Sequence, residues 1–295
     1  MEALTLMNPA EQLRTGTTLK GQKGTSYQIL KHLGGGGFGQ TYLAVANSPQ
    51  DRGQCVIKQL KLGPNIPLSL EDARERFQRE AGVLEKLGHH PQIPSLWDNF
   101  EQNNGFYFVQ DFIDGQELSK EIETGKPWSE GAVIGLLWDV LTVLKLIQSL
   151  EPPVSHRDIN PNNLIRRKSD RKIVVIDFGA FKEIKATLEG KQSEITICIG
   201  TPGYAPPEQM AGKPRTNSDI YALGMVALYA ATGRPPRQFD YDTQTGKLHF
   251  PPLPFSPDLS KILEKMVRAH YQERYQSATE VLQDLSPLHS IGSKL

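Results

Sequence analysis

The sequence predicts an α+β fold in which a strand-rich first third precedes a helix-rich remainder. In the first third, apolar and polar residues alternate around a glycine cluster, which is typical of half-buried strands joined by a tight turn. From Trp128 onward, apolar residues recur instead at helical spacing. The pattern changes near residues 113–117, where the dipeptide Asp114-Gly115 indicates a loop between two subdomains.

The first third is expected to contain several strands and one long helix. The stretches "YQILKHLGGGGFGQTYLAVA" (27–46), "QCVIKQLKL" (54–62) and "GFYFVQDFIDG" (105–115) have the composition and alternation of strands. Between them, residues 69–88 begin at the start signal of Ser69 and place four apolar residues on one helical face: Phe77, Ala81, Leu84 and Leu87.

The remainder is expected to be helical apart from one short buried strand, "KIVVIDFG" (172–179). The helical patterns cover residues 133–150, 218–232, 258–270 and 277–285. Residues 180–215 are rich in Gly, Pro, Ser and Thr, and a loop of that length inside a compact domain is usually functional or disordered.

Composition narrows the class of protein. A chain of 295 residues is long for one compact core, so two lobes are expected. Lysine plus arginine equals aspartate plus glutamate at 33 each, which gives no electrostatic reason to expect a nucleic acid or an anionic membrane as partner. Two cysteines are too few for a disulfide framework, and no signal or membrane segment is recognisable, so we expect a cytoplasmic protein.

Gly34, Gly36 and Gly39 form a G-x-G-x-x-G pattern, which by itself is weak evidence for a nucleotide site. A dinucleotide-binding fold would need a helix after the glycines and an acidic residue about 20 positions on. Here a strand follows, and Lys58 occupies that later position. The pattern therefore favours a glycine-rich hairpin that approaches nucleotide phosphates, with Lys58 reaching them from the next strand.

A more specific signal is "HRDINPNN" (156–163), followed by "IDFG" (176–179). The aspartate Asp158 could accept a proton from, or orient, an attacking hydroxyl group. The side-chain oxygen of Asn163 and the carboxylate of Asp177 are ligands suited to a hard cation. Either motif alone could be an ordinary loop, but their joint occurrence after Lys58 and Glu80 makes that explanation improbable.

Together these motifs resemble a eukaryotic-type (Hanks-type) protein kinase, most like a bacterial Ser/Thr kinase. The markers are "LGGGGFGQTYLA", "CVIK", Glu80, "HRDINPNN", "DFG", "GTPGYAPPEQ", "SDIYALG" and "QERYQSA". The resemblance implies a bilobal kinase fold, with an antiparallel sheet and one main helix in the N-lobe and a mostly helical C-lobe. It divides the chain into a leader (1–26), an N-lobe (27–113), a C-lobe (114–286) and a tail (287–295).

The resemblance implies binding of ATP and Mg²⁺, with Mn²⁺ as an alternative metal. Lys58 would hold the phosphates while paired with Glu80, and Gln110 would occupy the gatekeeper position. The implied ATP-binding residues are Leu33, Gly34, Gly36, Gly37, Phe38, Gly39, Thr41, Val56, Lys58, Gln110, Asp111 and Ile113. The implied catalytic residues are Asp158, Asn160, Lys58 and Glu80, and the implied metal ligands are Asn163 and Asp177.

A regulatory site is also implied. Arg157, Lys182 and Arg76 match basic positions that face one point in such kinases, which suggests a receptor for a phosphate group. The candidate phosphorylated residues are Thr196 first, then Thr187 and Ser193. The partners would be protein substrates, with the chain itself in trans among them. Under the alternative interpretation these basic residues are ordinary surface charges.

Asn160 is the main departure from the family pattern, because a lysine at this position contacts the transferring phosphoryl group. Charge-assisted hydrogen bonds are about twice as strong as neutral ones. The amide of Asn160 still has N–H donors, so we expect slower transfer rather than none. Val56 and Thr41 also differ from the usual alanine and valine, and would alter the nucleotide fit modestly.

Three functions are consistent with these residues. The first is an ATP-dependent Ser/Thr protein kinase that autophosphorylates within residues 180–201. The second is a pseudokinase, a nucleotide-binding signalling module, for which Asn160 is the principal support. The third is a small-molecule phosphotransferase, which is not expected to carry the Glu208 and Arg274 elements of a protein kinase.

Overall fold

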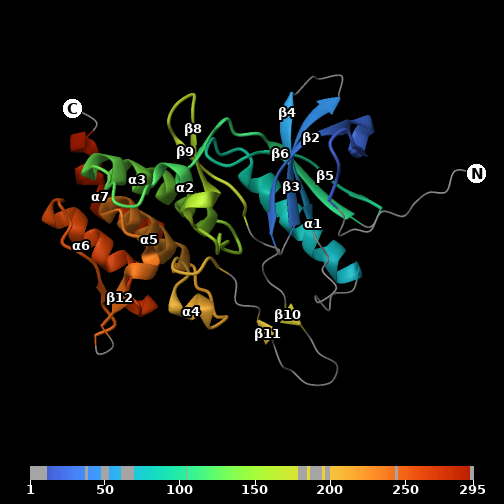
Figure 1. Ribbon diagram of the computed structural model, residues 1–295. Coiled ribbons are helices and arrows are strands. Elements are labelled where there is room, and N and C mark those ends of the chain that lie inside the picture. The colour runs from blue at the N-terminus through green and yellow to red at the C-terminus, as the bar shows by residue number, and fades with distance from the viewer. Residues whose placement is uncertain are drawn as a thin grey trace, which may run out of the picture. The chain divides into compact units, whose positions relative to one another are not determined.

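The computed structural model describes residues 12–36, 39–47, 53–60, 70–103, 105–178, 185–186, 195–196, 200–242 and 245–292. For a few of these, including Arg76, Lys185 and Thr196, it describes the backbone alone. The chain forms two compact units (Figure 1). The first contains residues 1–113 and 180–196, and the second contains residues 114–179 and 197–295.

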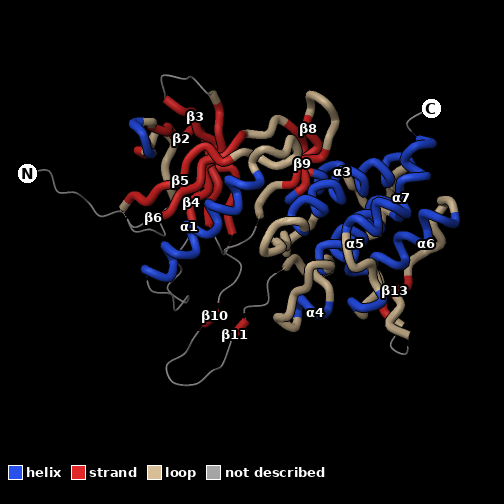
Figure 2. The backbone as a smooth tube through the Cα atoms, turned by 180° about the vertical axis from the view of Figure 1, so that it is seen from behind, coloured by secondary structure: helices blue, strands red, loops and turns tan. Residues whose placement is uncertain are grey.

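The first unit is built on a six-stranded antiparallel sheet with the strand order β1-β2-β3-β4-β6-β5 (Figure 2). The strands are β1 (Thr18–Lys20), β2 (Ser26–Gly36), β3 (Gly39–Asn47), β4 (Gln54–Leu60), β5 (Leu96–Gln102) and β6 (Gly105–Asp111). Helix α1 (Leu70–Leu87) packs on one sheet face, where Phe77 stacks on Phe108 with ring centroids 4.5 Å apart. The short strands β10 (Lys185–Ala186) and β11 (Ile195–Thr196) pair with each other.

The glycine cluster forms the predicted hairpin, since β2 and β3 pair down to Gly36 opposite Gly39. Gly39 has a packing reason to be glycine, because a Cβ there would lie 2.4 Å from the carbonyl oxygen of Gln59 on β4. Gly34 has none, because a Cβ there would meet nothing within 4 Å. The open space beside Gly34 fits a position that a ligand approaches closely.

Part of the predicted leader belongs to the fold of the first unit. Leu13 and Leu19 are buried in one apolar cluster with Tyr42 and other residues of the sheet. The backbone N–H of Leu13 donates to the Tyr42 hydroxyl at 3.0 Å, and that hydroxyl donates to Gln59 Oε1 at 3.0 Å. Leu13 and Leu19 therefore add to the apolar core on the sheet face opposite α1.

The second unit is mostly helical, with α3 at its centre packed against α5 and α7 (Figure 2). Its helices are α2 (Leu118–Glu121), α3 (Glu130–Gln148), α4 (Pro207–Met210), α5 (Ser218–Thr232), α6 (Pro257–Met266) and α7 (Ala278–Gly292). A small sheet joins β7 (Gly115–Glu117), β8 (Leu164–Arg167) and β9 (Ile173–Val175), and a second pairs β12 (Asp240–Tyr241) with β13 (Leu248–His249).

These elements confirm the predicted α+β class, and α5 spans the predicted residues 218–232. The sequence patterns did not predict β5, β7 and β8, because residues of mixed polarity form these strands only when they pair with neighbouring strands. Helix α7 runs past the predicted end and includes Pro287, which lies near its exposed end. Within the described part of the chain, no helix is long and apolar enough to cross a bilayer.

The buried hydroxyl of Tyr42 gives a test of how the N-terminal residues stabilise the first unit. Tyr42→Phe leaves the N–H of Leu13 and the side-chain oxygen of Gln59 without this partner, and we expect the free energy of unfolding to fall by about 1–3 kcal/mol. Urea unfolding of both proteins measures the difference. The control is Tyr271→Phe, at a half-exposed position of the second unit. Equal stability of Tyr42→Phe and the wild type would contradict this role.

Candidate active site

The loop that contains "HRD" is held by one buried carboxylate. Asp219, in the first turn of α5, is 1% exposed. Its Oδ2 accepts the backbone N–H of His156 and its Oδ1 accepts the backbone N–H of Arg157, both at 2.7 Å. Arg157 has a φ of 65°, which is uncommon for a non-glycine residue. The two hydrogen bonds to Asp219 fix this left-handed turn.

The side chain of His156 ties the same loop to the end of strand β9. Its ring is fully buried and lies 4.8 Å from the ring of Phe178. Nδ1 faces the backbone N–H of Asp158 at 3.3 Å, so it acts as the acceptor, and Nε2 donates to the carbonyl oxygen of Ile176 at 2.9 Å. A neutral imidazole with its proton on Nε2 satisfies both contacts.

The carboxylate of Asp158 is oriented by two donors. Its Oδ1 accepts the hydroxyl of Thr201 at 2.7 Å, and its Oδ2 accepts Nδ2 of Asn163 at 3.0 Å. The side chain remains partly exposed. This arrangement presents a fixed carboxylate at the surface of the second unit, where it could accept a proton from a hydroxyl group.

The side chain of Asn160 binds its own loop and Thr201. Its side-chain oxygen accepts the N–H of Asn162 at 2.9 Å and caps a single 3-10 turn, η2 (Pro161–Asn163). Its Nδ2 donates to the carbonyl oxygen of Asp158 at 3.0 Å and to the hydroxyl of Thr201 at 3.1 Å. With only 2% of its surface exposed, the residue braces the Asp158–Thr201 contact from behind.

The two metal-ligand candidates flank one hairpin. Asn163 directly precedes β8, Asp177 follows β9, and the N–H of Ile176 donates to the carbonyl oxygen of Asn163 at 3.0 Å. Nδ2 of Asn163 donates to the carbonyl oxygen and to Oδ2 of Asp158, which leaves its Oδ1 available to a cation. An amide oxygen and a carboxylate fit Mg²⁺, which is bound by one or two protein ligands together with phosphate oxygens and water.

The first unit carries the nucleotide-site candidates on one sheet face. In the sheet register Thr41 lies opposite Lys58, and Val56 lies opposite Gln110. Lys58 also lies opposite Phe108, which stacks on Phe77 of α1, and Glu80 follows three residues later along that helix. Glu80 is 7% exposed.

The remaining nucleotide candidates are only partly described. Leu33 is 45% exposed on β2, Asp111 is the last residue of β6, and Ile113 follows it. The carboxylate of Asp111 accepts the N–H of Ser95 at 2.8 Å and the indole N–H of Trp97 at 2.6 Å. These bonds hold the end of β6 against β5. Gly37 and Phe38 lie outside the described residues.

Arg157 is the one regulatory candidate whose side chain the structure describes. Arg157 lies in the loop described above, whereas Arg76 in α1 and Thr196 in β11 are described by their backbone alone. Lys182, Thr187 and Ser193 lie outside the described residues.

The structure adds one residue that the sequence did not single out. Nε2 of Gln209, in α4, donates to the carbonyl oxygen of Arg157 at 2.6 Å. This bond fixes the carbonyl group of the turn, whereas Asp219 fixes its N–H groups. The interaction has no local sequence signal, because it joins residues 52 positions apart.

Glu208 and Arg274, the two elements expected of a protein kinase, form a buried ion pair. Nη1 and Nη2 of Arg274 donate to the two carboxylate oxygens of Glu208 at 2.7 and 3.0 Å, and the arginine side chain is fully buried. Burial raises the pKa of Glu208, but the hydrogen bonds and charge of Arg274 outweigh it, and the pKa is lowered overall. The pair links α4 to the segment before α7.

The chain matches one protein family and several curated proteins. Residues 27–285 match the Protein kinase domain family. The chain is 40% identical over 264 residues to Serine/threonine-protein kinase PknA of Nostoc sp., and 41% identical over 265 residues to Serine/threonine-protein kinase B of Synechocystis sp.. Each alignment covers 88% of this chain and 46% of the relative, so the chain spans about half the length of these proteins.

Solved structures agree on the fold. The kinase domain of Mycobacterium tuberculosis PknI matches with a TM-score of 0.67 and 25% identity, over 96% of this chain and all of that domain. The apo form of PpkA-294 matches with a TM-score of 0.69 and 24% identity, over 93% and 99% of the two chains. Both matches confirm the predicted arrangement of an antiparallel sheet followed by a mostly helical region.

The buried carboxylate of Asp219 gives a test by pH. Burial, the larger effect, raises its pKa to about 6, although the N–H groups of His156 and Arg157 act in the opposite direction. Because the folded-state pKa exceeds the unfolded value, the folded protein binds this proton more tightly. The contribution of Asp219 to the free energy of unfolding should therefore fall by up to about 3 kcal/mol as the pH rises from about 4 to about 6, and stay constant above.

The measurement compares chemical unfolding of the wild type with Asp219→Asn between these pH values, because the difference isolates this one group. Asp258→Asn, at an exposed position in the first turn of α6, serves as the control and should show no such slope. If the free energy of unfolding of the wild type rose relative to that of Asp219→Asn as the pH rises, the two N–H bonds would outweigh burial. That result would contradict the expected sign.

Proposed function

Because this chain belongs to the protein kinase family, we propose that it transfers the γ-phosphoryl group of ATP to Ser and Thr hydroxyl groups of proteins. The relatives named above are Ser/Thr protein kinases, and the family uses ATP with a divalent metal ion. The substrates and partners of the whole protein belong to the proposal as well, since the chain spans about half of those relatives.

The observation that carries the proposal is the fixed carboxylate of Asp158. Thr201 and Asn163 hold its two oxygens at 2.7 and 3.0 Å while the group stays partly exposed. A carboxylate so placed can orient an incoming Ser or Thr hydroxyl group and accept its proton. Thr201 also fixes the following turn, since its carbonyl oxygen accepts the N–H groups of Tyr204 and Ala205.

The other proposed site residues bind and orient the nucleotide. Bound ATP supplies the phosphoryl group, and the metal ion neutralises charge on its phosphates. Asn163 and Asp177 would hold that ion, and Lys58, placed by β4 near the helix of Glu80, would bind the α and β phosphates. The glycine hairpin would cover the phosphates, because Gly34 leaves space where a side chain would otherwise lie.

Asn160 braces the loop in this proposal rather than contacting the phosphoryl group. Among the described residues, the hydrogen bonds of its side chain go to Asp158, Asn162 and Thr201. The site then has no cation at the position where the family carries a lysine, so transfer should be slower than with the lysine. This observation also favours the second candidate function, a nucleotide-binding signalling module with little or no phosphoryl transfer.

We propose further that the chain autophosphorylates within residues 180–201. Thr196 is the first candidate for the phosphorylated residue, followed by Thr187 and Ser193. Arg157, Lys182 and Arg76 would receive the phosphate group, as the family positions suggest. The support is the sequence match alone, because Arg157 is the only one of these whose side chain the structure describes.

Phosphate incorporation measured by intact mass, after incubation with Mg²⁺ and ATP, tests the proposal directly. We expect added phosphate with the wild type, and a rate about 10²–10⁴-fold lower with Asp158→Asn, because the base is removed while the shape is kept. Asp258→Asn, an exposed aspartate of α6, is the matched control and should retain the wild-type rate. Equal rates for wild type and Asp158→Asn would refute catalysis at this site.

The role of Asn160 is tested by two substitutions. Asn160→Ala removes the cap of η2 and both donors, so the free energy of unfolding should fall by about 1–2 kcal/mol together with kcat. Asn160→Lys should exceed Asn160→Ala in kcat by up to about 10²-fold, because it restores a charged donor. A lower kcat at unchanged stability in Asn160→Ala would assign the amide to the phosphoryl group instead of the brace. Activity only in Asn160→Lys would establish the signalling module.

A further inference from the structure

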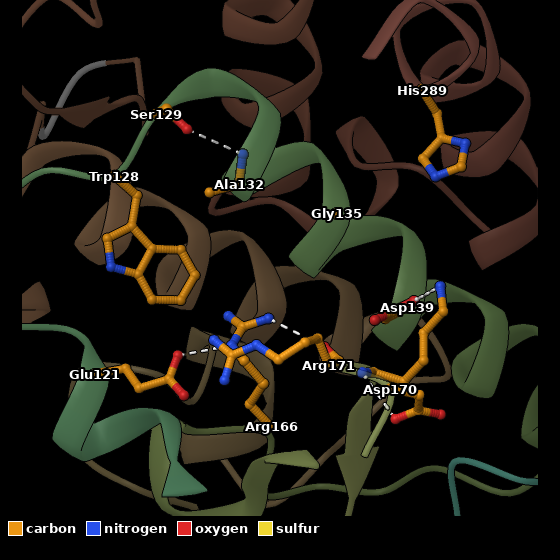
Figure 3. Close-up of a pocket in the computed structure, with 11 residues that line it drawn as sticks. Glu121, Trp128, Ser129, Ala132, Gly135, Asp139, Arg166, Asp170, Arg171 and His289 are labelled. Carbon is orange, nitrogen blue, oxygen red and sulfur yellow. Dashed lines mark hydrogen bonds and ion pairs between the residues drawn. The ribbon is translucent and has the colours of Figure 1, made fainter. Parts of the chain in front are cut away.

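The second unit contains a cleft that the proposed function does not use (Figure 3). It lies between α2, α3, the β8–β9 turn and α7, and its volume of about 610 Å³ is in the range of small-molecule sites. The turn is the end of the hairpin opposite to Asn163 and Asp177, so the cleft is separate from the proposed catalytic site. The residues that line it are Glu121, Trp128, Ser129, Ala132, Gly135, Asp139, Arg166, Asp170, Arg171, Lys172 and His289.

The floor of the cleft is a bare stretch of α3 formed by Ala132 and Gly135. Glycine in the interior of a helix lowers its stability relative to alanine. Packing gives no reason for it here, because a Cβ on Gly135 would meet nothing within 4 Å. Gly135 therefore keeps the floor open at some cost to the helix.

Among the described residues, the charged side chains that line the cleft form ion pairs, with the exception of one arginine. Arg166 pairs with Glu121 at 2.7 Å, Lys172 pairs with Asp139 at 2.9 Å, and Asp170 pairs with Arg167, which lies outside the lining, at 2.6 Å. Arg171 is exposed, and among the described residues its guanidinium group has no ion-pair or hydrogen-bond partner.

The backbone of Arg171 points to the same conclusion. Its φ of 62° is a left-handed conformation that glycine or asparagine adopts at lower cost. When Arg167, the partner of Asp170, is counted together with the charged residues that line the cleft, one positive charge is not balanced by a carboxylate. A long cationic side chain at this costly position gives the cleft a donor fork suited to a carboxylate or a phosphate.

Flat rings border the cleft on two sides. Figure 3 shows Trp128 and His289 on opposite sides, with the side chains of Arg166 and Arg171 between them. The guanidinium carbon of Arg166 lies 5.3 Å from the centre of the Trp128 ring. The imidazole of His289 stacks on Trp138, with 4.0 Å between centroids and 11° between planes. These planar surfaces beside a bare floor fit a flat molecule better than a bulky one.

We propose that this cleft binds a small organic anion, a planar ring that carries a carboxylate or phosphate group. The anionic group meets Arg171, and the ring lies over the surface of Ala132 and Gly135 between Trp128 and His289. Such an anion could be a free small molecule or an acidic side chain of a protein segment. The size of the cleft and its flat walls favour the free molecule.

The test uses naphthoate as the probe, and its neutral amide, naphthamide, as the matched ligand without charge. Binding to the full chain is measured by calorimetry and located by the indole N–H resonances. Trp128 lines the cleft and Trp138 stacks on its His289, whereas Trp97, on β5 of the first unit, serves as an internal reference. Inorganic phosphate and hexaglutamate are added separately to represent a simple anion and an acidic protein segment.

Two pairs of variants isolate the floor and the charge. Gly135→Leu fills the cleft, and Gly131→Leu makes the same change one turn earlier on α3, where a Cβ also meets nothing within 4 Å and no cleft is lined. Arg171→Gln removes the charge of the cleft. Arg234→Gln removes an equally exposed arginine outside it.

We expect naphthoate to bind at least about tenfold tighter than naphthamide, and to shift the Trp128 and Trp138 resonances but not that of Trp97. Gly135→Leu and Arg171→Gln should each weaken binding at least about tenfold, and their controls should not. Binding that survives both variants would overturn the proposal. So would hexaglutamate binding without naphthoate binding, which indicates a protein-docking surface, and so would phosphate binding as tightly as naphthoate, which indicates a simple ion site.

Discussion

The loop that carries Asp158 depends on the carboxylate of Asp219, which accepts the N–H groups of two consecutive residues at 2.7 Å each. Those bonds keep Arg157 in a left-handed conformation, which costs a non-glycine residue free energy and persists only when several surrounding contacts hold it in place. Gln209 fixes the carbonyl group of the same turn. The turn therefore directs the side chain of Asp158 toward Thr201 and Asn163, which hold its carboxylate in one orientation.

A second constraint is the β8–β9 hairpin, whose two ends contribute residues to two different sites. At one end it carries Asn163 and Asp177, and the N–H of Ile176 closes this end on the carbonyl group of Asn163. At the other end its turn carries Arg171 and Lys172 into the cleft on α3. A ligand at the turn would therefore contact the same short element that positions the candidate metal ligands.

Asn160 shows how the loop accommodates a change of charge. Its side chain is 2% exposed, and an ammonium group in that environment would need a strong partner. The neutral amide makes one acceptor contact and one donor contact within the loop, and a second donor contact with the hydroxyl of Thr201. Under the proposed function, Asn160 therefore braces the loop and supplies no charged contact to the substrate, so transfer would be slower than with a lysine.

The sequence by itself determined what depends on neighbouring residues: the glycine hairpin, the "HRDINPNN" and "IDFG" motifs, and the bounds of α5, which Gly233 ends in a left-handed conformation. Spacing and alternation are local properties, so they can be recognised without the fold. The tertiary structure alone decided the burial of Leu13 in the sheet core, the pairing of β5, and the contact of Asn160 with Thr201. That contact joins residues 41 positions apart, and no local pattern encodes it because its geometry exists only once the chain has folded.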